Sequence, residues 1–157
     1  PESCWGFGKN LDKIIDEETK AMLVREALAA RKNSYCPYSH FAVGAALLSD
    51  DGTVTRGANI ENAAFGVTNC AERSAIFAAA SRGERHFAAI AVVGAPEGQP
   101  ATELCTPCGS CRQVMTEFAE PEEFLVLLGT EDGSYRELTL SELLPYSFGH
   151  ELDKISK

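Results

Sequence analysis

The segment that most constrains the fold is the uninterrupted apolar run at residues 87–93, which is β-branched at Ile90, Val92 and Val93. A strand that is apolar on both faces is typical of a sheet covered on both sides. Residues 124–128 form a second buried strand of the same kind. We therefore expect the core of this chain to be a sheet that is covered on both faces.

Helices are expected at three longer segments and one short segment. The first has an Asp suited to cap its start, the second ends at a Gly, and the fourth begins with a capping box and ends at a Pro. These signals place the four helices at residues 16–32, 70–83, 108–118 and 139–145.

A β-hairpin is expected between the first two helices. Residues 41–48 form an apolar run, residues 50–52 supply a turn, and the second strand runs out near Asn59. The segment 94–107 is rich in Pro and is expected to be a loop, and residues 132–133 a turn. The alternation of helices with buried strands predicts an α/β sandwich with a mixed sheet, whose first strand pair is antiparallel.

The length of 157 residues favours one compact domain. Residues 1–13 show no hydrophobic periodicity and are expected to be an N-terminal extension, and residues 14–157 are expected to be a single domain.

The formal net charge is -9, with no Lys/Arg run longer than 31–32, which argues against nucleic acid or an anionic membrane as a partner. No apolar stretch approaches the ~20 residues that span a bilayer.

Cysteines are clustered in this sequence, because Cys105, Cys108 and Cys111 lie within seven residues. The first residues lack the basic and apolar regions of a secretion signal, so a cytoplasmic location is expected. In a reducing compartment, such clustering is typical of metal or redox chemistry. Cys70 and Glu72 stand at another predicted helix start, about 35 residues earlier.

A zinc ion suits these residues. Cys108 and Cys111 share a face of the first helical turn, within reach of one ion at a Zn–S distance of ~2.3 Å. Catalytic zinc has three protein ligands and one open position, whereas a purely structural site would take Cys105 as a fourth sulfur. Three thiolates leave a net negative charge, which Arg73 and Arg112 could offset by donating hydrogen bonds to the sulfurs. Thiol redox chemistry at the C-x-x-C pair is a further alternative.

Glu72 could supply acid–base chemistry beside such an ion. A carboxylate next to a metal-activated water can take a proton from it and transfer that proton to a substrate. The alternative is a helix N-terminal Glu that only complements the helix dipole. Residues two apart on a regular helix point about 200° away from each other, so Cys70 and Glu72 converge only if this first turn is irregular.

Six stretches spread over residues 35–149 carry a family resemblance: YCPYSHF, VGAALL, NIENA, CAER, PCGSCRQ and ELLP. In this order they resemble the cytidine deaminase family, in its small homotetrameric type with three cysteines on zinc. The general cysteine, glutamate and P-C-x-x-C pattern is that of the zinc deaminases. The resemblance implies a three-layer α/β/α sandwich with a mixed five-stranded sheet.

The resemblance also implies roles for individual residues. Cys70, Cys108 and Cys111 resemble the zinc ligands, and Glu72 resembles the proton shuttle. The resemblance implies that Asn59 and Glu61 bind the ribose hydroxyls and that Phe41 packs on the nucleoside. It also implies that the Ala71 N–H binds the pyrimidine O2. Phe65 and Phe148 resemble the aromatics that complete the sites of neighbouring subunits. Without the resemblance, the aromatics would be interpreted as ordinary packing and the polar pair as a solvated strand end.

The expected activity is hydrolytic deamination of cytidine and deoxycytidine to uridine and deoxyuridine, with release of ammonia, as in pyrimidine salvage. The resemblance implies one Zn²⁺ per chain and a homotetramer acting on a small nucleoside. Two alternatives are a deaminase of another cytosine-containing substrate, such as a polynucleotide, and a non-catalytic structural zinc module.

Overall fold

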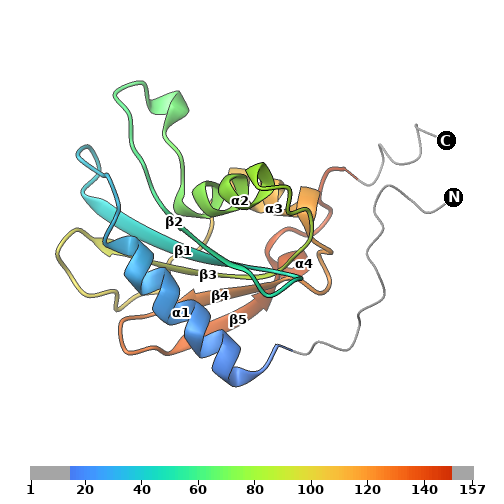
Figure 1. Ribbon diagram of the computed structural model, residues 1–157. Helices are drawn as coiled ribbons and strands as arrows, with labels where there is room; N and C mark the ends of the chain where they lie inside the picture. Colours follow the sequence, from blue (N-terminus) through green and yellow to red (C-terminus); the bar gives the residue numbers. More distant parts are fainter. Residues whose placement is uncertain (1–14, 150–157) are drawn as a thin grey trace, which may run out of the picture.

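The computed structural model describes residues 15–149, and its central feature is a five-stranded sheet between helical layers (Figure 1). The expected extension at residues 1–13 lies outside the described residues. The strands are β1 (Phe41–Ser49), β2 (Val54–Ala58), β3 (Phe87–Pro96), β4 (Leu125–Gly129) and β5 (Tyr135–Thr139), and the helices are α1 (Glu17–Arg31), the 3₁₀ turn η1 (Phe65–Val67), α2 (Ala71–Ser81), α3 (Gly109–Phe118) and α4 (Leu140–Leu143).

The sheet is mixed, with the strand order β2-β1-β3-β4-β5. Strand β1 is antiparallel to both β2 and β3, β3 is parallel to β4, and β4 is antiparallel to β5. Helix α1 covers one face, and α2 and α3 cover the other (Figure 1). The expected α/β sandwich, with its antiparallel first pair, is therefore confirmed.

Two features of the sheet differ from the expectation. Strand β3 continues to Pro96, although residues 94–107 were expected to be a loop throughout. The last three residues of β3 pair with residues 41–43 of β1, so the partner strand extends β3 into a Gly- and Pro-containing segment. The residues of β5 were not located in the sequence, although the resemblance implied five strands, because β5 is a short edge strand without a fully buried side chain.

Glycines let the helices approach the sheet closely. A Cβ atom on Gly44 of β1 would lie 2.0 Å from the carbonyl oxygen of Ala27 in α1, and one on Gly57 of β2 would lie 2.3 Å from that of Ala71 in α2. Each glycine is therefore covered by helix backbone. As a result the first turn of α2 rests directly on β2, which fixes the position of Cys70 and Glu72.

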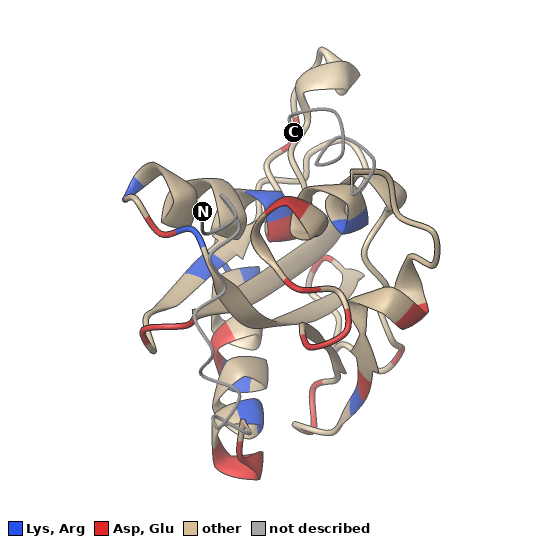
Figure 2. Cartoon of the chain, turned by 90° about the vertical axis from the view of Figure 1, so that its right-hand side faces the viewer, with Lys and Arg blue, Asp and Glu red and all other residues tan. Residues whose placement is uncertain are grey.

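The predicted helix ends are confirmed at three places. The Asp16 carboxylate accepts a hydrogen bond from the Thr19 N–H at 2.8 Å, Gly83 follows α2 with a φ of +97°, and Thr139 caps α4. Acidic and basic residues are both spread over several elements in this view of the described chain (Figure 2). No helix within residues 15–149 combines the length and apolar character needed to cross a bilayer.

Candidate active site

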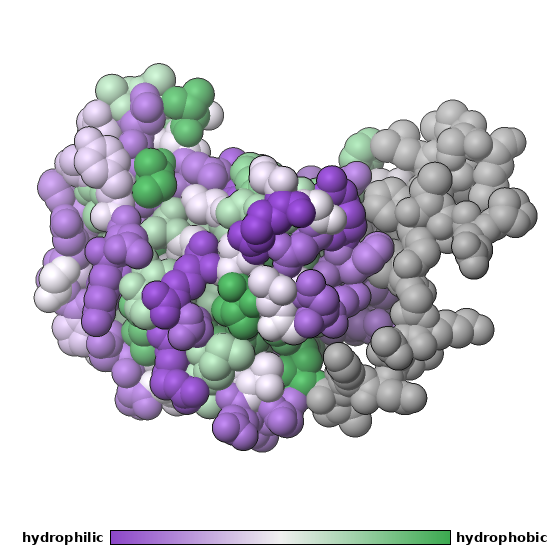
Figure 3. Space-filling model, viewed as in Figure 1, coloured by the Kyte–Doolittle hydropathy of each residue, from purple (hydrophilic) through white to green (hydrophobic). Residues whose placement is uncertain are grey.

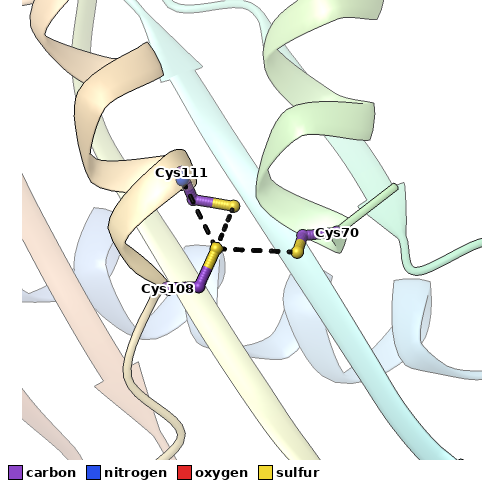
Figure 4. A group of neighbouring side chains, drawn as sticks. All are labelled: Cys70, Cys108 and Cys111. Carbon is purple, nitrogen blue, oxygen red and sulfur yellow. Dashed lines mark hydrogen bonds between the residues drawn. The ribbon is translucent and has the colours of Figure 1, made fainter. Parts of the chain in front are cut away.

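Three cysteine sulfurs meet where two helices begin. Cys70 is the N-cap of α2 and Cys108 the N-cap of α3, and both have extended backbone conformations. Cys111 lies in the first turn of α3 and points toward the other two (Figure 4). The Sγ atoms of Cys70 and Cys108 are 3.8 Å apart, and those of Cys108 and Cys111 are 3.5 Å apart.

This cluster fits a zinc ion. Tetrahedral coordination with Zn–S bonds of ~2.3 Å separates the sulfur atoms by roughly 3.8 Å. All three sulfurs lie within 4.8 Å of one another, and they form the one candidate group of metal ligands among residues 15–149. Cys105 is not a member, so the four-sulfur shell of a structural site is not assembled here. The sulfur donor set suits zinc.

Arg73 places a positive charge beside the sulfur cluster. Its Nη2 donates a hydrogen bond to the Sγ of Cys70 at 3.3 Å. A hydrogen bond from Cys111, supported by Arg73, lowers the pKa of Cys70 to about 5, although partial burial acts in the opposite direction. The pKa of Cys111 is raised by the same hydrogen bond and by burial. Burial likewise raises the pKa of Cys105 to about 11, so this thiol stays protonated.

Glu72 lies beside the sulfur cluster in a buried position. Its side chain is only 4% exposed, and it occupies the second residue of α2. Burial raises the pKa of Glu72 to about 7, and the charge of Cys70 adds to this rise. Hydrogen bonding, chiefly to the Glu72 backbone, acts in the opposite direction. A carboxyl group with a pKa near 7 can both accept and release a proton at neutral pH.

The amide of Asn59 ties the end of β2 to the start of β1. Its Nδ2 donates to the carbonyl oxygen of Phe41 at 2.8 Å, and its Oδ1 accepts from the Val43 N–H at 2.9 Å and from the hydroxyl of Ser34. These contacts occupy the oxygen fully, since a carbonyl oxygen has two lone pairs. One N–H of Asn59 is left for a further acceptor.

Glu61 lies two residues further on, next to an open hollow of about 370 Å³ lined by Tyr38, Ser39, Glu61, Phe65 and Thr68. Its Oε1 accepts the backbone N–H groups of Tyr38 and Ser39 at 3.0 and 3.1 Å. Hydrogen bonds from Ser39 lower the pKa of Glu61, so the group is a carboxylate at neutral pH. Sequence reasoning missed the part played by this loop, although the YCPYSHF stretch contains it.

Phe41 and Ala71 are each the first residue of an element, β1 and α2. Phe41 opens β1 and is partly exposed, and a Cβ on Gly94 would lie 3.0 Å from its Cε1 atom, so the ring rests on that glycine. Ala71 is fully buried at the first position of α2. The N–H groups of a first helical turn have no intrahelical partner, so the Ala71 N–H suits an external acceptor.

Three further residues were suggested by the sequence, and of these only Phe65 lines the hollow beside Glu61. Arg112 donates from Nη1 to the carbonyl oxygen of Leu143 at 2.5 Å, and its Nε is buried without a partner among the described residues. Its described hydrogen bond is therefore made to the last residue of α4, and not to a sulfur. Phe148 is 65% exposed, and its carbonyl oxygen accepts from Gln113 at 3.0 Å. Phe65 is 74% exposed and packs edge-on against Tyr38.

Comparisons with known proteins agree on one family. A family model described as the cytidine and deoxycytidylate deaminase zinc-binding region matches residues 17–127. A cytidine deaminase of Halalkalibacterium halodurans is 54% identical over 132 residues, which cover 84% of this chain and 96% of that protein. One of Sporosarcina psychrophila is 48% identical over 129 residues, which cover 82% and 90% of the two chains. The crystal structure of a cytidine deaminase from Burkholderia pseudomallei matches with a TM-score of 0.73 and 46% identity, over 81% of this chain and 97% of that one.

Proposed function

This chain belongs to the cytidine and deoxycytidylate deaminase family, and we propose that it deaminates cytidine and deoxycytidine hydrolytically to uridine and deoxyuridine, releasing ammonia. The observation that carries the proposal is the buried carboxyl group of Glu72 beside three sulfurs at the starts of α2 and α3. We further propose that residues 14–157 form a single catalytic domain.

Cys70, Cys108 and Cys111 would hold the zinc, whose contribution is that of a Lewis acid that makes water nucleophilic at neutral pH. Glu72 moves the protons of the reaction. It accepts one from the attacking water and delivers it to ring N3. It then takes the proton of the new C4 hydroxyl and passes it to the amino group, so that ammonia leaves as the C4–N bond breaks and the C4 carbonyl forms. The raised pKa of Glu72 suits this exchange, because neither protonation state is strongly favoured near pH 7.

The substrate is held by polar groups whose hydrogen-bonding capacity is not used up within the protein. One N–H of Asn59 and the second carboxylate oxygen of Glu61 suit the ribose hydroxyls, and the Ala71 N–H suits the pyrimidine O2. The exposed edge of Phe41 offers an apolar surface for the nucleoside. Among residues 15–149, no Lys or Arg lines the hollow beside Glu61. A free nucleoside therefore suits this site better than a polynucleotide, whose phosphates would meet a carboxylate.

The proposed assembly is a homotetramer. Large apolar side chains are exposed on the loop between β2 and α2 and near the C-terminal end of the described chain: Ile60, Phe65, Val67, Tyr146 and Phe148. Some of this apolar surface is visible where the loop projects from the body of the molecule (Figure 3). Covering it with neighbouring copies would bury apolar area and bring Phe65 and Phe148 to adjacent sites. Light scattering should then give a mass of about 68 kDa, four times that of the 16.9 kDa chain.

Cytoplasmic pyrimidine salvage is the role that we propose. The reaction converts a cytosine nucleoside into a uracil nucleoside, which is a salvage step. The metal ligands are free thiols, which persist where the surroundings are reducing.

The decisive experiment follows the loss of ultraviolet absorbance after cytidine is added, with zinc measured in the same sample. We expect turnover together with one zinc per chain. A parallel assay with a cytosine-containing oligonucleotide tests the substrate class, and faster turnover of the oligonucleotide would contradict the nucleoside assignment. A zinc-loaded protein that leaves cytidine unchanged would contradict the enzymatic proposal and favour the structural module.

A further inference from the structure

Arg31, the last residue of α1, holds the end of the sheet at which β1 begins. Its side chain is 13% exposed and donates from Nε to the carbonyl oxygen of Ala42 at 3.0 Å. Its Nη2 reaches the carbonyl oxygens of the last two residues of β3 at 3.2 and 2.9 Å, and that of Gln99 at 2.8 Å. One side chain thus gathers four backbone carbonyls from β1, β3 and the loop after β3.

This arrangement requires an arginine. The planar guanidinium has five donors in a fixed fork, whereas a lysine ammonium is a single point with three. Nη1 of Arg31 lies 4.0 Å from the carboxylate of Glu131, so a second charge faces it from the turn between β4 and β5. The backbone of Arg31 is also fixed, because Gly44 of β1 lies directly beneath it.

Phe41, the aromatic residue that we propose contacts the nucleoside, lies at the same end of the sheet. Asn59 holds the carbonyl oxygen of Phe41, and Arg31 holds that of the next residue in β1. The Phe41 ring rests on Gly94, which lies in the stretch of β3 that ends at the Arg31 contacts. Arg31 therefore fixes both the strand from which Phe41 projects and the strand on which its ring lies.

Resting on the proposed function, we infer that Arg31 is a positioning residue for nucleoside binding, acting through Phe41. The residues of chemistry lie on α2 and α3, on the face of the sheet opposite α1, and Arg31 contacts none of them. Loss of the guanidinium should therefore weaken substrate binding and leave the chemical step and the zinc site intact.

Arg82 offers a matched control. It is the C-cap of α2, it donates from Nε to Glu84 at 2.9 Å, and its Nη2 donates to the hydroxyl of Thr55 in β2. Like Arg31, it joins a helix end to the sheet. Thr55 is paired with Leu47, six residues along β1 from Phe41, which places Arg82 roughly 20 Å from the nucleoside end. A purely structural role would give both arginines the same phenotype.

The test measures KM and kcat for cytidine, zinc per chain and the thermal midpoint in Arg31→Met, Arg31→Lys and Arg82→Met. We expect Arg31→Met to raise KM at least about fivefold, because small misplacements of a binding group weaken its contacts strongly. Its kcat should stay within about twofold and its zinc content at one per chain. Arg31→Lys should give an intermediate KM, and Arg82→Met should lower the thermal midpoint without changing KM.

An unchanged KM in zinc-loaded Arg31→Met, or an equal rise in Arg82→Met, would overturn the inference while the wild-type turnover still supports the proposed function. Should Arg31→Met not fold, Arg31→Lys decides the matter alone, since it keeps the stem and the charge, and a wild-type KM in that variant overturns the inference. A wild-type protein that does not deaminate cytidine overturns the proposed function and this inference with it.

Discussion

Cys70 and Glu72 stand two residues apart, and they reach the same site because only Glu72 is helical. Cys70 is an N-cap with φ -74° and ψ 157°, whereas Glu72 is the second residue of α2. On a regular helix these side chains would point about 200° apart. The extended backbone at Cys70 instead lets its sulfur face Cys108, while the buried carboxyl group of Glu72 stays close enough for the charge of Cys70 to raise its pKa.

Replacing Glu72 by Gln should separate metal binding from catalysis. The amide keeps the shape of the carboxyl group and the sulfur cluster is untouched, so one zinc per chain should remain. Proton transfer is lost, and kcat should fall by ~10² to 10⁴, the usual contribution of a positioned acid–base group. Turnover of cytidine and zinc content are measured on the same preparation. Near-normal turnover would contradict the role given to Glu72.

Replacing Cys105 by Ala should leave both zinc and activity in place. Cys105 is outside the group of sulfurs that can share one ion, and its thiol stays protonated because burial raises its pKa to about 11. The matched variant Cys108→Ala removes a sulfur that lies within 3.8 Å of both others, so it should lose the metal. Zinc released by the Cys105 variant would instead favour a structural four-sulfur site.

The fold could be predicted to the extent that its signals are local. Two uninterrupted apolar runs sufficed for a sheet covered on both faces, and capping residues sufficed for the ends of α1 and α4. The end of β3 and the whole of β5 could not be found in this way. Gly94 and Pro96 are strand residues only because β1 pairs with them, and β5 is too exposed to carry an apolar period.

The residues of the candidate site were likewise predictable only where their signals are local in the sequence. The cysteines and Glu72 stand in short motifs, and the structure brings them together. The contacts of Asn59 with Phe41, and of Arg112 with Leu143, join residues 18 and 31 positions apart, and no local pattern predicts them. The side chain of Arg112 could only be interpreted through its neighbour Cys111, which is why a bond to sulfur was considered for it.

Removing the side chain of Arg73 should have a different effect on zinc affinity from removing that of Arg112. Arg73→Ala loses the hydrogen bond to Cys70, and we expect zinc affinity or activity to fall by about 10- to 100-fold, as is usual for groups behind a metal ligand. Arg112→Ala should keep its zinc affinity and lose stability, because its described bond is to the Leu143 carbonyl. A hydrogen bond to a charged group contributes about 1.5–3 kcal/mol. Equal losses of zinc affinity in the two variants would contradict this division.

The carboxylate of Glu61 should make a pH-dependent contribution to stability. Hydrogen bonds from Ser39, and then from Tyr38, hold its pKa below the ordinary value of 4.5. A lowered pKa in the folded state stabilises the fold above the unfolded value, and this stabilisation is lost as the pH falls through the lower, folded value. The difference in thermal midpoint between wild type and Glu61→Gln should thus be constant from pH 7 to about 5 and shrink below 4.5. A difference that varies between pH 5 and 7 would point to another group.

Adding one methyl group at Gly44 should destabilise the protein strongly. The new Cβ would lie 2.0 Å from the Ala27 carbonyl oxygen and 2.4 Å from the Arg31 nitrogen, so α1 would have to move off the sheet. Overpacking of this kind costs about 1–3 kcal/mol or more, which exceeds the ~0.4–1 kcal/mol that a Gly→Ala change recovers from the unfolded chain. At Gly66 nothing lies within 4 Å of the added atom, so Gly66→Ala should change the free energy of unfolding by no more than about 0.5 kcal/mol. Denaturant unfolding of the two variants measures the contrast, and equal stabilities would mean that α1 does not rest on β1 as closely as described.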